Sequence, residues 1–165
     1  MQSRPFNSDE PLAYFIAWTC YGTGLHGDER GWHLGGKGEQ SAADAKLRAA
    51  AKSRMVETEF YMSMQDRLKV EETVRRHSEI RGWCLHRVHA RTNHVHVVIT
   101  ARHFRPEAIR DQLKAWCTRM LKRDHPSRQR FWTEGASVRY INHEEDLEAA
   151  IEYAGDAQTR KSCSE

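Results

Sequence analysis

The chain has 165 residues, of which 39% are hydrophobic and 30% charged, and its formal net charge at pH 7 is +3. This length suits one domain with a single core, and none of the four cysteines forms the C-x-x-C pair of a zinc module. No apolar run approaches the roughly 20 residues of a membrane span, and the first residues carry no secretory signal. We therefore predict a cytoplasmic protein with no membrane partner.

Charge is distributed unevenly along the chain. Residues 81–130 have a net charge of +9, whereas residues 1–80 have −1 and residues 131–165 have −5. A basic middle segment beside an acidic tail indicates an anionic partner for one face, and nucleic acid is the common one. The alternative is a solvated surface that happens to be basic.

The beginning of the chain predicts a strand followed by a long loop. Residues 1–11 carry two prolines and are typical of a loose arm. The aromatic run 12–21 is apolar on both faces, as in a central strand. Residues 22–38 are rich in glycine, lack an apolar period and contain His26 and His33. Loops of this length tend to be functional or disordered.

Two helices are expected next, the first of them within an insertion that spans residues 22–64. Alanine and charged residues dominate 41–54, which predicts a short helix there. A clearer helix covers residues 65–80, although its apolar stripe is thin. The apolar residues of that stripe are Leu68, Val74 and Ile80.

A hairpin and a third helix follow. Residues 83–91 and 94–100 predict two strands joined by a polar turn, and thus an antiparallel hairpin. Residues 106–123 predict a helix, because Pro106 suits the first turn and basic residues gather in the last one. The predicted buried stripe of this helix consists of Ile109, Leu113, Trp116, Met120 and Leu121.

The last elements are a short strand over 137–142 and a helix capped by Asn142, with a frayed tail over 159–165. The residues at the i, i+3, i+4 and i+7 positions of a buried stripe are Leu147, Ala150, Ile151 and Ala154. The element order predicts an α+β ferredoxin-like sandwich in a single domain over residues 1–165. It has an antiparallel sheet of about four strands, helices on one face and a C-terminal helix.

The segment from Asn93 to Ile99 is the most informative stretch of the sequence. Side chains alternate along a strand, so His94 and His96 share the face of Val98, directed away from the apolar core. The two imidazoles then lie about 6–7 Å apart along the strand. Such a pair can bind a divalent metal that takes further oxygen ligands. The alternative is two surface histidines on a half-exposed strand.

Tyr153 lies on the last predicted helix, about 120° from the centre of its apolar stripe. It is therefore not simply a core residue, although a tyrosine at the flank of a helix can still pack while its hydroxyl stays hydrated. Taken alone it is a weak candidate for a nucleophile, and it gains weight only beside the histidine pair.

Basic side chains that can contact phosphates are concentrated in the segment of charge +9. Trp132 can stack on bases, whereas Trp116 belongs to an apolar stripe and is expected in the core. The candidate DNA-contacting residues are Arg91, Asn93, Arg102, Arg105, Lys114, Arg119, Lys122, Arg123, Arg128 and Arg130.

Three stretches resemble the single-tyrosine HUH endonucleases, and more closely the REP-associated tyrosine transposases and their insertion-sequence relatives. These stretches are Phe15–Gly22, Arg91–Val98 and Ala150–Tyr153, and Leu25–Gly31 looks like a subgroup of the same bacterial proteins. The resemblance covers roughly residues 13–158.

The resemblance implies a definite mechanism. His94 and His96 would bind Mg²⁺ or Mn²⁺, which would polarise the scissile phosphate. Tyr153 would attack phosphorus in line and give a 5′-phosphotyrosine and a free 3′-OH, and attack by another 3′-OH would then join strands. The implied partner is single-stranded or hairpin DNA, which would place the protein at the nucleoid.

The expected third metal ligand departs from the family pattern. Relatives in the insertion-sequence branch place a polar ligand, often Gln, four residues after the tyrosine, where this chain has Ala157. Asp156 lies about 60° from Tyr153 on an ideal helix and Gln158 about 140°. Geometry favours Asp156 and residue type favours Gln158, so both stay candidates. The loop pair His26 and His33 is a further alternative.

Three functions remain open at this point. The leading one is a metal-dependent endonuclease and strand transferase of the transposase type. A domesticated protein that holds hairpin DNA without cutting it is the first alternative, favoured by the displaced third ligand. The second is an unrelated hydrolytic metalloenzyme, against which the basic segment weighs. The resemblance leaves both a monomer and a homodimer open.

Overall fold

The computed structural model describes residues 10–23, 32–33, 40–41 and 55–162, and the side chains within 10–23 and 55–155. The predicted short helix therefore lies, apart from its first residue, outside the described residues. The same holds for the side chains of His26 and His33. No described helix is long and apolar enough to cross a membrane.

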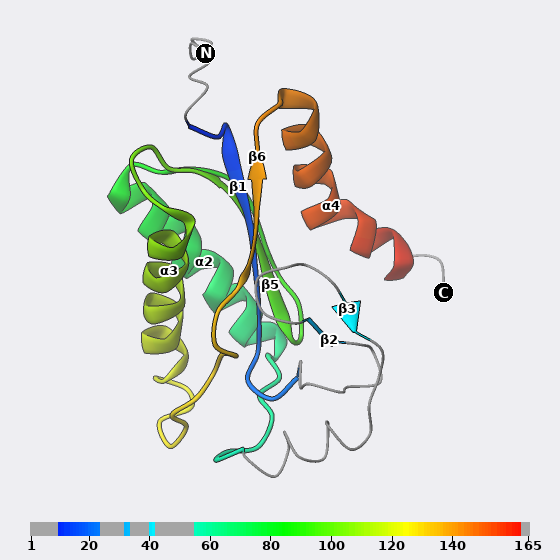
Figure 1. Ribbon diagram of the computed structural model, residues 1–165. Helices are drawn as coiled ribbons and strands as arrows, with labels where there is room; N and C mark the ends of the chain where they lie inside the picture. The colour runs from blue at the N-terminus through cyan, green and yellow to red at the C-terminus, as the bar shows by residue number, and fades with distance from the viewer. Residues whose placement is uncertain (1–9, 24–31, 34–39, 42–54, 163–165) are drawn as a thin grey trace.

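Four antiparallel strands form the main sheet in the spatial order β4-β5-β1-β6 (Figure 1). The strands are β1 (Ala13–Thr19), β4 (Cys84–Ala90), β5 (His94–Thr100) and β6 (Ser137–Ile141). Two further strands, β2 (Trp32–His33) and β3 (Gln40–Ser41), pair with each other in a separate ribbon. The helices are α2 (Met64–Arg81), α3 (Pro106–Leu121) and α4 (Glu144–Ser162).

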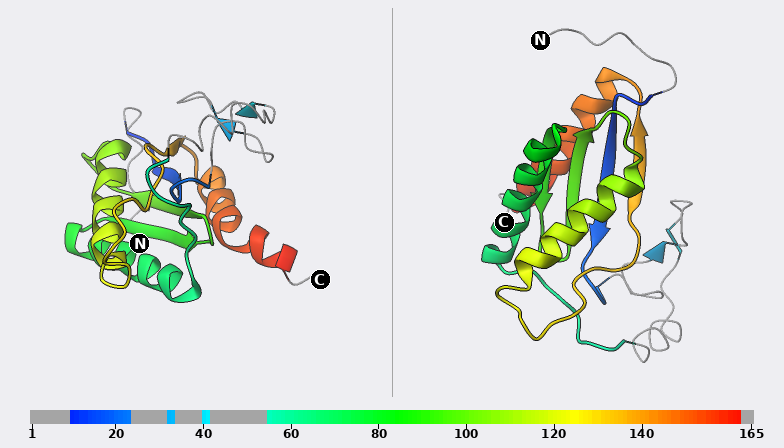
Figure 2. Two further views of the ribbon diagram at one scale, coloured as in Figure 1. Left: turned by 90° about the horizontal axis from the view of Figure 1, so that it is seen from below. Right: turned by 90° about the vertical axis from the view of Figure 1, so that its left-hand side faces the viewer.

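The helices lie on both sides of the sheet. α2 and α3 cover one face, and α4 crosses the other, as Figure 1 shows with the sheet nearly edge-on and Figure 2 shows from two further directions. This arrangement confirms the predicted α+β fold with its antiparallel sheet and C-terminal helix, and adds that the C-terminal helix takes the opposite face. The order β1-α2-β4-β5-α3-β6 is that of a ferredoxin-like sandwich.

The main core fills the space between the sheet and the helices α2 and α3. Val95, Val97 and Ile99 of β5 point into it and have no exposed surface. Trp18 of β1 and Leu113 of α3 pack in the same cluster. A central strand that contributes every second residue to this core has a fixed register, because a shift by one residue would bury the other set of side chains.

A smaller apolar cluster joins α4 to the opposite face. Its buried residues are Ala13, Phe15, Val98, Ile141 and Ala154, and Leu147, Ala150 and Ile151 pack against them. The four helix residues among these confirm the predicted buried stripe of the last helix. Because Tyr153 directly precedes the buried Ala154, the packing of α4 on this cluster sets the distance between Tyr153 and the sheet.

Two predicted core stripes are partly wrong. Val74 of α2 is fully buried as predicted, but Leu68 and Ile80 are 61% and 73% exposed, because Val70 is the residue that shares the buried face with Val74. On α3 the predicted Ile109, Leu113 and Leu121 are fully buried. Cys117 is buried in place of Trp116, which is turned to the surface and is 40% exposed. Because the apolar stripe of α2 has few residues, the sequence alone determined poorly which face of this helix packs on the sheet.

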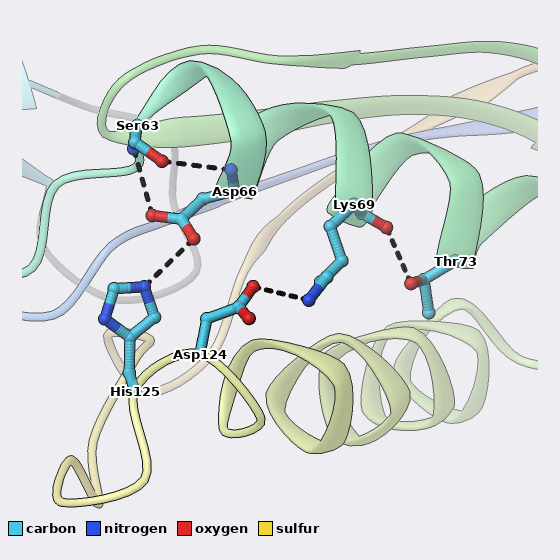
Figure 3. Close-up of polar contacts among 6 residues, drawn as sticks. All are labelled: Ser63, Asp66, Lys69, Thr73, Asp124 and His125. Atoms are coloured by element: carbon cyan, nitrogen blue, oxygen red, sulfur yellow. Dashed lines mark hydrogen bonds and ion pairs between the residues drawn. The ribbon is translucent and has the colours of Figure 1, made fainter.

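Polar contacts hold the beginning of α2 to the segment that follows α3 (Figure 3). The backbone N–H of Asp66 donates to Ser63 Oγ at 3.1 Å and its carboxylate accepts from the Ser63 N–H at 3.0 Å, which forms a capping box. His125 lies 2.9 Å from the other carboxylate oxygen, and Lys69 pairs with Asp124. The two helices are thereby tied together at this end.

Candidate active site

The two histidines of β5 lie side by side on the face that α4 covers. His94 is half-buried and His96 is 8% exposed, and the centroids of their rings are 4.7 Å apart. The ring of Phe15, from the neighbouring strand β1, lies 5.3 Å from that of His96. The predicted alternation along β5 is confirmed, but His96 is more enclosed than a bare sheet face would leave it, because α4 lies above it.

Tyr153 stands next to this pair. Its ring is nearly parallel to that of His96, at an interplanar angle of 22° and a centroid distance of 6.1 Å, and 55% of the residue is exposed. The structure thus brings together three side chains that are far apart in the sequence, with the tyrosine open to solvent on one side. Two other tyrosines, Tyr61 and Tyr140, are equally exposed at 53% and 59%, so exposure alone does not distinguish Tyr153.

The environment keeps His96 neutral at physiological pH. Burial, and then the nearby His94, His89 and Arg91, lower the pKa of His96 to about 4. Its Nδ1 atom is buried and has no hydrogen-bond partner among the residues that the structure describes. A neutral imidazole with an unshared lone pair is what metal ligation requires.

His94 is oriented by its neighbour. Its Nδ1 lies 2.8 Å from Asn93 Oδ1, so that Nδ1–H donates to the amide oxygen and Nε2 keeps a lone pair. Asn93, predicted to contact DNA, therefore holds the histidine. Two backbone hydrogen bonds of 2.7 Å hold the turn that precedes His94. The N–H of Cys20 donates to the carbonyl of Asn93, and the N–H of Met62 donates to the carbonyl of Thr92.

These features fit a divalent metal at His94 and His96. The two imidazoles approach from one strand, and at least one of them is held in the tautomer that a ligand needs. Within the described side chains no cluster of three or more His, Cys, Asp or Glu residues could hold a metal ion, so His94 and His96 would supply two ligands of such a site. Asp156 and Gln158 both lie on α4, and their side chains are outside the described set.

A bulge in β4 adds residues that the sequence analysis missed. Leu85 pairs with Ile99 and Arg87 with Val98, so His86 is an extra residue between them. Beyond the bulge Arg87 and His89 face α4 instead of the main core, with His89 directly opposite His96. The sequence held a signal for this change, because the apolar residues Leu85 and Val88 are three apart and break the period of two.

The predicted DNA-contacting residues are spread over the molecule. Arg91 and Asn93 adjoin the histidines, whereas Arg102 and Arg105 follow the far end of β5. Lys114 donates to the carbonyl oxygens of Thr133 and Gly135 at 2.8 and 2.9 Å, which gives it a structural role. The remaining candidates lie on α3 or in the segment after it, namely Arg119, Lys122, Arg123, Arg128 and Arg130.

Some of these side chains already have partners within the protein. The guanidinium of Arg119 lies 4.5 Å above the ring of Trp116, and that of Arg128 lies 5.0 Å above Phe60. Lys122 is 3.2 Å from Gln129 Oε1. Trp132, considered for base stacking, is half-buried and donates its Nε1–H to Thr118 Oγ1 at 3.0 Å. Arg91, by contrast, acts electrostatically on His96, and its backbone N–H donates to the carbonyl of His94 at 2.7 Å.

The family model described as "Transposase IS200 like" matches residues 52–154, a span that contains the histidine pair and Tyr153. The chain belongs to the IS200-like transposase family. A comparison with curated proteins finds no match.

Two solved structures match this chain. One is a REP-associated tyrosine transposase bound to a REP hairpin, with a TM-score of 0.51, 8% sequence identity, and coverage of 98% of this chain and 73% of that one. The other is a crystal structure described as a transposase from Deinococcus radiodurans, with a TM-score of 0.48 and 12% identity over 93% of this chain and 94% of that one. At these identities, the former structure supports the fold of this IS200-like transposase and no more.

Proposed function

We propose that this IS200-like transposase is a metal-dependent single-stranded DNA endonuclease and strand transferase that uses Tyr153 as its nucleophile. Its sites would lie beside DNA hairpins, since the REP-associated tyrosine transposase of similar fold is bound to a REP hairpin. The observation that carries the proposal is the stacking of Tyr153 on His96, 6.1 Å apart, in a site where His94 lies 4.7 Å from His96.

The position of Tyr153, beside His96 and partly open to solvent, supports a covalent step. Tyr153 Oη would attack the scissile phosphorus in line, a new oxygen–phosphorus bond would form, and the bond to the 3′ oxygen would break. The phenol loses its proton and the departing strand gains one as its 3′-OH. The product is a 5′-phosphotyrosine that keeps the energy of the phosphodiester, so a second 3′-OH can reverse the step and join two strands.

His94 and His96 would hold Mg²⁺ or Mn²⁺, with Asp156 or Gln158 of α4 as the candidate third ligand. When bound, the metal would offset the negative charge that develops on the phosphate oxygens. Asn93 would keep the His94 ring in place, and Phe15 would support the ring of His96 from below. Because Tyr153 is on the same helix as both candidate third ligands, the position of α4 would set nucleophile and metal site together.

The test is cleavage of a labelled single-stranded hairpin from the flanks of the gene, with Mn²⁺ and with EDTA. We expect a metal-dependent cut and a protein–DNA adduct that survives a denaturing gel. Tyr153→Phe should lose both, whereas Tyr140→Phe, at an equally exposed tyrosine, should keep both. An adduct that persists in Tyr153→Phe contradicts the assignment of the nucleophile.

A protein that binds the hairpin tightly but forms neither product nor adduct would identify the alternative, a hairpin-binding relative without cleavage activity. Sedimentation of the protein with and without hairpin DNA would decide between a monomer and a homodimer.

A further inference from the structure

The edge strand β4 carries a row of basic side chains past the candidate active site. Because of the bulge at His86, Arg87 and His89 face α4, and the alternation continues to Arg91 just beyond the strand. Neighbouring members of this row are about 6.5–7 Å apart. That interval is comparable with the step between successive phosphates of an extended nucleic-acid strand.

The row lies close to the site at both ends. His89 is directly opposite His96 in the sheet, and both His89 and Arg91 contribute to the low pKa of His96. At the other end, the guanidinium of Arg87 occupies the space that a Cβ on Gly155 would take, two residues after Tyr153. The row therefore runs beneath α4 where this helix carries the tyrosine.

Two of the three side chains in this row are arginines, Arg87 and Arg91. Burial lowers the pKa of His89, Glu71 of α2 acts against this, and Arg91 and Arg87 lower the pKa further. The Glu71 carboxylate is itself engaged, since it accepts from the N–H of Ala90 at 3.0 Å and lies 3.7 Å from Arg75. A phosphate placed over His89 and Arg91 would be attracted by the charge of Arg91 and could accept a hydrogen bond from the ring N–H of a neutral His89.

The row is accessible from solvent. His89 and Arg91 are only half-buried, and β4 is an edge strand. A groove of about 580 Å³ follows that edge between α2 and β4, and Arg75, Arg87 and His89 are among its lining residues together with Glu71 and Glu79. Arg87 and His89 therefore reach a surface that is open to solvent at this edge of the sheet.

We infer that His89 and Arg91 bind the phosphate backbone of the DNA strand that is cut, next to the scissile phosphate. Arg87 positions α4 over this row through its contact with Gly155. The inference rests on the proposed function for the role of the bound strand, but binding itself requires neither metal nor cleavage. The contacts are to phosphates, so they are independent of base sequence.

The experiment measures the affinity of the full chain for fluorescein-labelled oligothymidylate by anisotropy, in EDTA, over a series of salt concentrations. Each phosphate that a cationic side chain neutralises on a single strand contributes a slope of about −0.7 to log K against log salt. Arg91→Ala should therefore lower the magnitude of the slope by about 0.7. His89→Ala should weaken binding about threefold by loss of a hydrogen bond.

Two matched variants keep the result interpretable. Arg91→Lys retains the charge and should retain the slope, and Arg81→Ala removes an exposed arginine at the end of α2 and should change nothing. Thermal unfolding of each variant checks that it is folded. An unchanged slope in folded Arg91→Ala overturns the inference.

The inference and the proposed function fail in different ways. A reduced slope in Arg91→Ala, with no covalent adduct in the unmodified protein, would support phosphate binding by this row and contradict the proposed nuclease function. An adduct in the unmodified protein, with the same slope in Arg91→Ala, would do the reverse.

Discussion

The two faces of the sheet bury different kinds of side chain, although one strand serves both. On the side of α2 and α3, β5 contributes Val95, Val97 and Ile99, all fully buried in an apolar core. On the side of α4 it contributes Val98 together with His94 and His96. The buried Nδ1 of His96 has no hydrogen-bond partner in the described part of the chain, and basic residues lie nearby. The first face supplies the free energy of folding, which allows the second to hold polar groups that cost stability.

The same contrast applies to the helices. α2 and α3 share a large core and are tied together by Asp66–His125 and Lys69–Asp124, whereas α4 rests on a small apolar cluster. Elements with few buried apolar contacts need the least free energy to unfold locally. The helix that carries Tyr153 is thus less firmly attached than the helices that carry the fold, and its position can respond to a bound strand.

The largest effect on stability should come from the face of α2 and α3. Leu113→Ala removes a fully buried side chain at the centre of the main core and should lower the free energy of unfolding by about 2–5 kcal/mol. The cleavage rate per folded molecule should stay unchanged, because the histidine face is not touched. Urea unfolding and cleavage assays on the same preparation measure the stability and the rate. A Leu113→Ala protein that is stable but inactive would contradict the assignment of stability to one face of the sheet and of catalysis to the other.

The next effect concerns the support of the metal site. Asn93→Ala removes the acceptor of the His94 Nδ1–H and should weaken Mn²⁺ binding about 10- to 100-fold, with little change in stability. Titration calorimetry with Mn²⁺ gives the affinity. Equal affinities in the two proteins would show that Asn93 does not orient the ligand.

The smallest effect lies at the beginning of α2, far from the chemistry. Burial alone raises the pKa of Asp66, but hydrogen bonds from His125 and Ser63 outweigh it and hold this pKa below its ordinary value. Asp66→Asn should cost about 1–2 kcal/mol at pH 7, where the carboxylate is charged.

The pH dependence of that cost has a definite sign. The contribution of Asp66 is complete above the ordinary carboxyl pKa of about 4 and is lost as the pH falls through the lower pKa of the folded protein. The difference in unfolding free energy between Asp66→Asn and the unmodified protein should therefore shrink in acid. A difference that stays constant from neutral to acidic pH would contradict the assignment.

Much of the fold could be predicted because the strong signals are local. The alternation from His94 to Ile99 placed the histidines opposite the apolar residues, and the spacing from Leu147 to Ala154 gave the buried stripe of α4. The helical angle between Tyr153 and that stripe predicted that this residue lies outside the core, and it is 55% exposed.

The remaining features depend on tertiary contacts. Whether Trp116 or Cys117 faces the sheet is a rotation of α3 by about 100°, which packing against α2 decides. The burial of His96 follows from α4 crossing the opposite face, which no local pattern records. The role of Arg87 required the bulge in β4, whose one sequence signal is the irregular spacing of Leu85 and Val88.

His96 and Val97 offer the most direct test of the division between the faces, since they are neighbours on one strand. The measurement is the cleavage rate per folded molecule of His96→Ala and Val97→Ala, with hairpin binding and urea unfolding of each protein alongside. His96→Ala should lose at least about hundredfold in cleavage and keep most hairpin binding. Val97→Ala should keep the rate and lose about 2 kcal/mol of stability. Equal loss of cleavage and binding in His96→Ala, or lost cleavage in folded Val97→Ala, would contradict this account.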